Sequence, residues 1–138
     1  MRPLPLPLAL VAGLLATACA KPNPARAEAG RVIEEIDRIG STPAAARPPL
    51  LDDLARRELA ETDVRRVRDL CVDAYRKLAE AKAAADAAGE VEGDPTVPGV
   101  RLEMTKRLLA AQESQTTATK RHEGCRTALG ALRAKTPR

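Results

Sequence analysis

The sequence predicts an all-α fold: a short N-terminal helix packed on a long antiparallel, coiled-coil-like helical hairpin that a disulfide clamps. Three observations support this prediction. Apolar and small residues recur at helical spacing over most of the chain. Aromatic residues make up only 1% of the 138 residues, with no Trp or Phe, so any core must be thin. Proline and glycine gather in two segments, 40–49 and 89–99, which separate the helical patterns from one another.

The first predicted helix covers about residues 24–39. Asn23 and Pro24 mark its start, because an asparagine side chain can cap free backbone N–H groups and proline fits the first helical position. Gly40 marks its end, and residues 40–48 form a predicted linker rich in proline and alanine. The apolar residues of this helix share one face: Ala29, Val32, Ile33, Ile36 and Ile39.

The second predicted helix covers about residues 49–89. Its first leucines follow Pro49, and the pattern either continues unbroken from there or restarts at Thr62 and Asp63. Farther along, apolar and small residues alternate in steps of three and four, which is the spacing of a coiled-coil seam. Residues 90–99 then form a predicted hairpin loop. The seam residues are Val64, Val67, Cys71, Ala74, Leu78, Ala81, Ala85 and Ala88.

The third predicted helix covers about residues 100–134 and repeats the heptad spacing. Its weakest segment is 112–119, which is polar and contains β-branched threonines, so helix there is predicted from the register alone. The seam residues are Met104, Leu108, Ala111, Gln115, Ala118, His122, Cys125, Leu129 and Leu132.

Folding the second and third helices back on each other brings the two seams together. When Cys71 faces Cys125, the other residues of the first seam also meet residues of the second. Much of the seam is alanine, so the helices can approach closely enough for a disulfide, whose Cα atoms lie about 4.4–6.8 Å apart. We therefore predict a Cys71–Cys125 disulfide. Closing a loop of about 55 residues stabilises a fold by roughly 4 kcal/mol in the chain-entropy model.

The N-terminus has the layout of a secretory signal. Arg2 precedes an apolar run from Leu8 to Leu15, which is too short to span a bilayer as a helix, and small residues follow. The segment Leu15–Cys19 then resembles the lipobox of bacterial lipoproteins, with Ala16 where that motif favours an aliphatic residue. This resemblance covers only the first residues. It implies cleavage before Cys19, which would carry a diacylglyceryl group with acyl chains such as palmitate.

The resemblance implies a signal peptide over 1–18 and a lipid-anchored tether over 19–23, and the helical patterns predict one helical domain over 24–138. An exported chain meets the oxidising conditions that a disulfide requires. In lipoproteins an aspartate after the cysteine retains the chain at the inner membrane. Ala20 gives no such signal, so the periplasmic face of the outer membrane is expected. The alternative is cleavage after Ala20, which would release a soluble secreted protein.

The histidine and the two distal cysteines suggest one possible metal site. His122 lies one helical turn from Cys125, with Cys71 opposite. Neither a C-x2-C pair nor a second histidine accompanies them, as structural zinc sites usually require. We therefore predict no metal and no cofactor, and keep these three residues as the alternative ligands.

Two further function classes are not expected. Catalysis is not expected, because no nucleophile motif accompanies the single histidine. Nucleic-acid binding is not expected, although the net charge is +4, because acidic residues interleave the arginines of 56–68 and aromatic stacking residues are missing.

We expect a structural or adaptor role in the cell envelope, with the hairpin presented to a protein or cell-wall partner. The alternative is an envelope protein that binds a small ligand or a metal through His122 and the cysteines. Two surfaces are candidates for the contact, the hairpin loop 90–99 and an arginine-rich face. Self-association is a further expectation, because the faces carrying Leu70, Tyr75 and Leu109 need a cover; the alternative is that the first helix covers them. The arginines are Arg56, Arg57, Arg65, Arg66 and Arg68.

Overall fold

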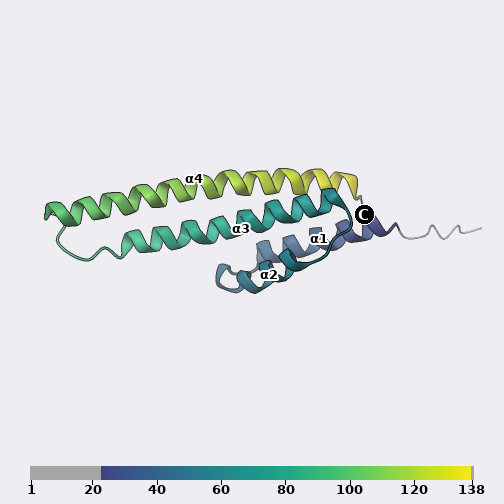
Figure 1. Ribbon diagram of the computed structural model, residues 1–138, viewed down its shortest axis with the longest axis horizontal. Coiled ribbons are helices and arrows are strands. Elements are labelled where there is room, and N and C mark those ends of the chain that lie inside the picture. The colour runs from purple at the N-terminus through teal and green to yellow at the C-terminus, as the bar shows by residue number, and fades with distance from the viewer. Residues whose placement is uncertain (1–22, 138) are drawn as a thin grey trace, which may run out of the picture.

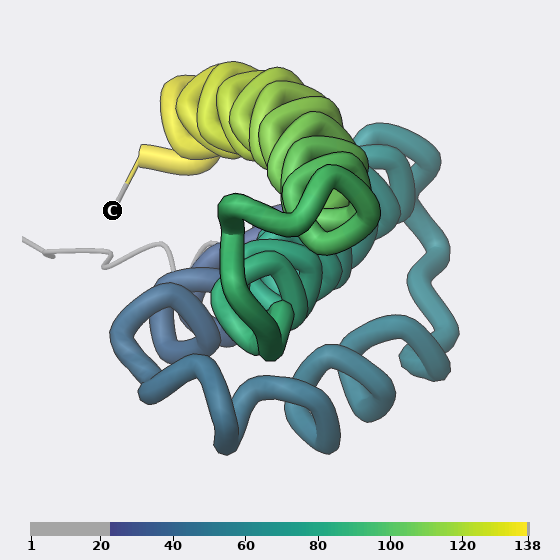
Figure 2. The backbone as a smooth tube through the Cα atoms, turned by 90° about the vertical axis from the view of Figure 1, so that its left-hand side faces the viewer, coloured from purple at the N-terminus to yellow at the C-terminus, as the bar shows by residue number. Residues whose placement is uncertain are grey.

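The computed structural model describes residues 23–137, and every regular element in this range is a helix. The two longest helices, α3 (Thr62–Gly89) and α4 (Pro98–Lys135), pack together as an antiparallel hairpin. α1 (Pro24–Ser41) and α2 (Arg47–Arg56) lie along α3, as Figures 1 and 2 show, and the 3-10 turn η1 (Ala44–Ala46) lies between them. The predicted all-α class with a helical hairpin is confirmed for this part of the chain.

Side chains at both ends of α1 satisfy free backbone groups. The Asn23 side chain accepts a hydrogen bond from the N–H of Ala25 at 3.0 Å, as an N-cap does. At the other end, the hydroxyl of Thr42 donates to the carbonyl of Arg38 at 2.7 Å. The predicted apolar face is confirmed, since all five of its residues are buried: Ala29, Val32, Ile33, Ile36 and Ile39.

Of the two possibilities for 49–89, the unbroken helix is wrong and the restart at Thr62 is confirmed, because the chain leaves the helical conformation at 57–61 and α3 begins at Thr62. The carboxylate of Glu28 in α1 accepts the N–H groups of Ala60 and Glu61 at 3.0 and 2.9 Å. These bonds satisfy backbone donors where α3 starts. Because Glu28 is more than thirty residues away in sequence, the local pattern could not decide between an unbroken helix and this restart.

The predicted linker 40–48 contains more helix than its prolines led us to expect. η1 lies within it, and α2 starts at Arg47 with Pro48 in its first turn, where a helix makes no use of the N–H group that proline lacks. The Arg47 guanidinium donates back to the carbonyls of Thr42 and Gly40 at 2.8 and 3.2 Å. The end of α1 and the start of α2 are therefore fixed to each other.

The contact between α3 and α4 follows the predicted seam only in part. Ala85, Leu108 and Gln115 are exposed, and Ser114 is half-buried where Gln115 was expected. A straight helix has 3.6 residues per turn, so a strict heptad pattern drifts around it by about 20° per heptad. The heptad prediction therefore fails toward the loop. The seam residues that are buried are Val64, Val67, Cys71, Ala74, Ala81, Ala88, Ala118, Cys125, Leu129 and Leu132.

α1 and α2 cover only one half of the hairpin formed by α3 and α4. In the half next to the open end, where residues 62 and 135 lie, α1 supplies branched side chains such as Ile36 and Ile39, which are 2% and 1% exposed, and α2 supplies Leu51 and Leu54. Toward the loop end, the two long helices continue alone (Figure 1) and meet through buried alanines. No helix in residues 23–137 is both long and apolar enough to cross a bilayer.

Candidate functional site

Cys71 and Cys125 face each other across the α3–α4 contact. Their sulfur atoms are 2.07 Å apart, a disulfide-bonding distance, and their Cα atoms are 4.7 Å apart. Both side chains are buried, and the neighbouring Ala74 is 0% exposed. A small residue at that position lets the helix backbones approach this closely. The structure thus brings the predicted cysteine pair together.

His122, the third candidate metal ligand, lies against an aromatic ring. Its imidazole meets the Tyr75 ring edge to face, with 6.0 Å between ring centroids, and the Arg47 guanidinium carbon lies 5.3 Å from the centroid of the same tyrosine. This cluster joins α2, α3 and α4 beside the cysteine pair. Within residues 23–137, no three His, Cys, Asp or Glu side chains gather as they would around a metal ion.

The arginines of the predicted arginine-rich face lie in α2, in the segment that follows it and in α3, and most of them make hydrogen bonds or ion pairs. Arg57 pairs with Glu35 of α1 at 2.7 Å, and Arg68 donates to the carbonyl of Arg57 at 2.6 Å. Arg56 pairs with an acid of its own helix. Arg57 and Arg68 thus join separate segments of the fold, whereas Arg66 lines an open groove.

The loop between α3 and α4 is a compact turn at the end of the hairpin far from the C-terminus (Figure 1). Asp94 accepts hydrogen bonds from the Thr96 hydroxyl and N–H at 2.7 and 2.8 Å, and these bonds lower the pKa of the Asp94 carboxyl. Gly93 has a φ of +120°, and a Cβ there would lie 3.0 Å from Val100, so this position requires glycine. The turn therefore has a defined conformation.

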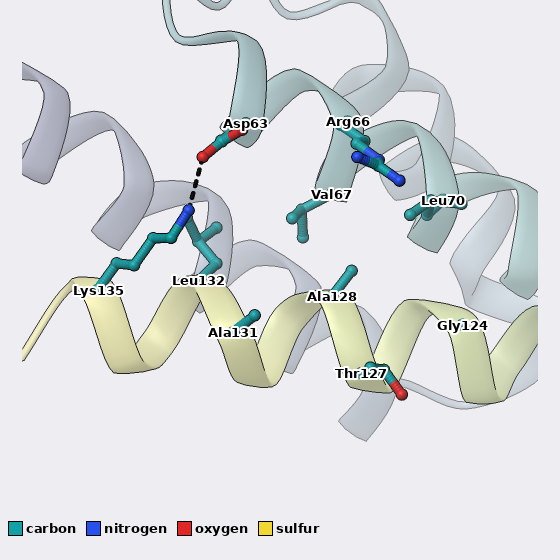
Figure 3. Close-up of a pocket in the computed structure, with 10 residues that line it drawn as sticks. All are labelled: Asp63, Arg66, Val67, Leu70, Gly124, Thr127, Ala128, Ala131, Leu132 and Lys135. Atoms are coloured by element: carbon teal, nitrogen blue, oxygen red, sulfur yellow. Dashed lines mark hydrogen bonds and ion pairs between the residues drawn. The ribbon is translucent and has the colours of Figure 1, made fainter.

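A groove of about 510 Å³ lies between α3 and α4 near the open end (Figure 3). Val67 and Leu70 form its apolar α3 wall. Asp63 and Lys135 form an ion pair at 2.8 Å across one end, and this hydrogen-bonded contact lowers the pKa of the Asp63 carboxyl. An apolar chain fits the chemistry of these walls. The opposite wall, on α4, carries Leu132 and four small residues: Gly124, Thr127, Ala128 and Ala131.

The sequence pointed to part of this groove without predicting it. Leu70 was expected to need a cover, and it is a half-buried wall residue. Gly124, Ala128 and Ala131 are spaced four and three residues apart, so they share one helical face. A line of small residues can either line a groove or form a close contact with another helix. Only the positions of the neighbouring helices decide which of the two it does.

The predicted lipidation site Cys19 and the predicted signal peptide lie outside the described residues. Comparison with known proteins finds no matching family model, no matching curated protein and no matching solved structure.

Proposed function

We propose that this protein is a lipid-anchored protein of the bacterial cell envelope with a structural or adaptor role. The observation that carries the proposal is the short distance between the lipobox-like segment and the folded domain. Cys19 ends that segment, and α1 begins at Pro24 with its cap at Asn23. A chain anchored at Cys19 has only a few residues, with a reach of about 17 Å, between the lipid and the fold.

The shape of the molecule supports a role in presentation. α1 starts at the open end of the hairpin, beside the C-terminus (Figure 1). With that end held at a membrane, α4 extends the chain away from the lipid, and its 38 residues span about 57 Å. The loop end then stands farthest from the anchor, available to a protein or cell-wall partner. Ala20 favours the periplasmic face of the outer membrane as the location.

The anchor is tested by the intact mass of the protein purified from a bacterial membrane fraction, before and after reduction and thiol alkylation. We expect a chain that starts at Cys19 and carries diacylglycerol. A chain starting at Lys21 would support the soluble secreted alternative instead, and one retaining Met1 would contradict both.

The same measurement separates the adaptor proposal from metal binding through His122 and the cysteines. Two alkylatable thiols that appear only after reduction mean that Cys71 and Cys125 are oxidised, and an oxidised pair offers no thiolate to a metal. Free thiols that zinc protects from alkylation would favour the metal site.

The adaptor role is tested at the loop end. Replacing residues 90–98 with a short Gly-Ser turn should preserve the helical circular dichroism spectrum, because the buried core lies elsewhere. It should also abolish the phenotype that the intact protein provides. A truncated protein that folds and keeps the phenotype would remove the loop from consideration.

A second candidate function, binding of a small apolar ligand, is favoured by the groove beside Leu70. Titration with a fluorescent fatty acid tests it. Leu70→Glu should abolish binding, because it places a charge on the apolar wall. Val97→Glu, at a residue 48% exposed and outside the groove, is the matched control and should bind normally.

A further inference from the structure

A second heptad runs along α4 on the face turned away from α3. Its members follow in steps of four and three, every one is exposed, and none is charged. Leu102 and Leu109 are 55% and 61% exposed, and Leu108 beside them is 57% exposed. Most of the exposed large apolar residues of the described chain therefore lie on this short stretch of α4. The stripe consists of Pro98, Leu102, Thr105, Leu109, Gln112, Thr116 and Thr119.

The threonine hydroxyls of this stripe already have hydrogen-bond partners within α4. The hydroxyls of Thr105, Thr116 and Thr119 each donate to the carbonyl four residues earlier, at 2.9 Å in all three cases. A hydroxyl bonded within its own helix needs no partner on a covering surface. Covering the stripe therefore leaves no threonine hydroxyl unsatisfied, although the stripe is only partly apolar.

Charged residues of alternating sign flank the stripe, so that a second, antiparallel copy can place opposite charges beside them. Lys106, Glu113 and Lys120 follow at seven-residue spacing along one side, with alternating sign. Among the described residues neither Lys106 nor Glu113 makes an ion pair, so both charges are available. Alternating charge beside a heptad seam selects the partner and its direction in coiled coils.

We propose that a second copy of this chain covers the stripe, with the two α4 helices antiparallel. In the register that we assign, Leu109 lies opposite Gln112 of the second copy, and Thr105 lies opposite the partner's Thr116. Lys106 then meets the partner's Glu113, and the two-fold axis creates this ion pair twice. A parallel pair would instead place Arg101 beside the partner's Lys106 twice, and like charges repel. The charge pattern therefore favours the antiparallel arrangement.

The inference goes beyond the proposed function and does not depend on the anchor. The dimer contact uses the loop half of α4, which α1 and α2 leave bare (Figure 1). The open ends, where α1 begins, then lie at opposite ends of the dimer. Two anchored copies in this arrangement would join two facing surfaces, and each loop end would still lie far from its own anchor.

Charge exchange tests the register. The mass of the purified full chain, in detergent where it carries a lipid, is followed by sedimentation equilibrium over a concentration series. Lys106→Glu and Glu113→Lys should each weaken the dimer roughly tenfold, because two attractions become repulsions. The double variant should restore the affinity. Lys120→Glu is the control, because this register places the partner's Gly99 opposite, and it should leave the affinity unchanged.

Cysteine crosslinking tests the direction. When chains carrying Thr105→Cys and Thr116→Cys are mixed and mildly oxidised, we expect mixed dimers above the level of the unsubstituted chain. Thr105→Cys alone should form few, because its two copies lie about 16 Å apart along the antiparallel axis. Circular dichroism checks that each variant folds. A monomer at all concentrations, a dimer indifferent to Lys106→Glu, or efficient Thr105→Cys homodimers would each overturn the proposal.

Discussion

The carboxylate of Glu28, in the second turn of α1, accepts the backbone N–H of Glu61 at 2.9 Å immediately before α3 begins. It accepts the N–H of Ala60 as well. One side chain thus joins two helices that are far apart in sequence and caps the longer one. No side chain near the start of α3 provides this cap, so the first helix supplies it.

Glu28→Gln should destabilise the fold near neutral pH, because a neutral amide is a weaker acceptor than a carboxylate for two N–H groups. The bonds from Ala60 and Glu61 lower the pKa of the Glu28 carboxyl. Its contribution to stability is therefore complete above the ordinary glutamate pKa of about 4.3 and is lost as the pH falls through the lowered value.

Urea unfolding of both proteins at about pH 7 and about pH 2.5 checks this prediction. The difference in midpoint should be present at the higher pH and vanish at the lower one. Glu34→Gln, on the exposed face of the same helix, is the control and should not differ from the unsubstituted chain. An effect of Glu28→Gln that is equal at both pH values would contradict the capping role.

Gly40 and Tyr75 form a second testable contact, because a Cβ at residue 40 would lie 2.8 Å from the Tyr75 hydroxyl oxygen. Gly40→Ala should destabilise the protein by about 1 kcal/mol through overpacking. Gly30→Ala should stabilise it by about 0.5–1 kcal/mol, since a Cβ at residue 30 meets nothing within 4 Å and alanine favours helix.

Tyr75→Phe distinguishes the clash with the Tyr75 hydroxyl from other effects of Gly40→Ala. Without the hydroxyl, the nearest ring carbon is 3.9 Å from the new Cβ, an ordinary contact. Gly40→Ala should then no longer destabilise, and thermal unfolding of the four proteins in this double-mutant cycle measures the coupling. An equal loss in both backgrounds would rule out the clash as the cause.

Reduction of the Cys71–Cys125 pair should lower the free energy of unfolding by roughly 4 kcal/mol in the chain-entropy model, given a sequence separation of 54 residues. Urea unfolding with and without a reductant measures this loss. The variant Cys71→Ser/Cys125→Ser should match the reduced protein and show no response to the reductant. Identical curves for the unsubstituted chain under both conditions would mean that the pair is not oxidised.

The core at the open end should carry most of the stability. Ile36→Ala removes a side chain that is 2% exposed and should cost about 2–5 kcal/mol, whereas Leu108→Ala removes one that is 57% exposed and should change stability by less than about 0.5 kcal/mol. Chemical denaturation of the two variants checks the contrast. Similar losses would show that Leu108 is covered in solution.

The sequence predicted those features that local patterns encode. The apolar face of α1 follows from helical spacing, and the Cys71–Cys125 pairing follows from one register choice applied to two seams. The sequence left open whether the helix restarts at Thr62, because the cap that favours the restart comes from Glu28 across the fold.

The exposure of some seam residues and the position of the groove could not be predicted, because they depend on how whole helices pack together. The exposure of Leu108 and Gln115 results from the drift of a straight helix against a heptad, which accumulates with distance from the cysteine pair. The groove beside Leu70 depends on which side of the hairpin α1 and α2 leave uncovered, and no single helix carries that information.

The position of the cysteine pair also determines how the molecule transmits tension. A pull applied between the first and last helices enters α3 and α4 from the open end. With the Cys71–Cys125 bond formed, the load crosses from one helix to the other at that level, and the chain between the two cysteines carries none of it. The loop half of the hairpin would keep its shape while the open end yields, so a surface carried there is insulated from strain at the chain ends.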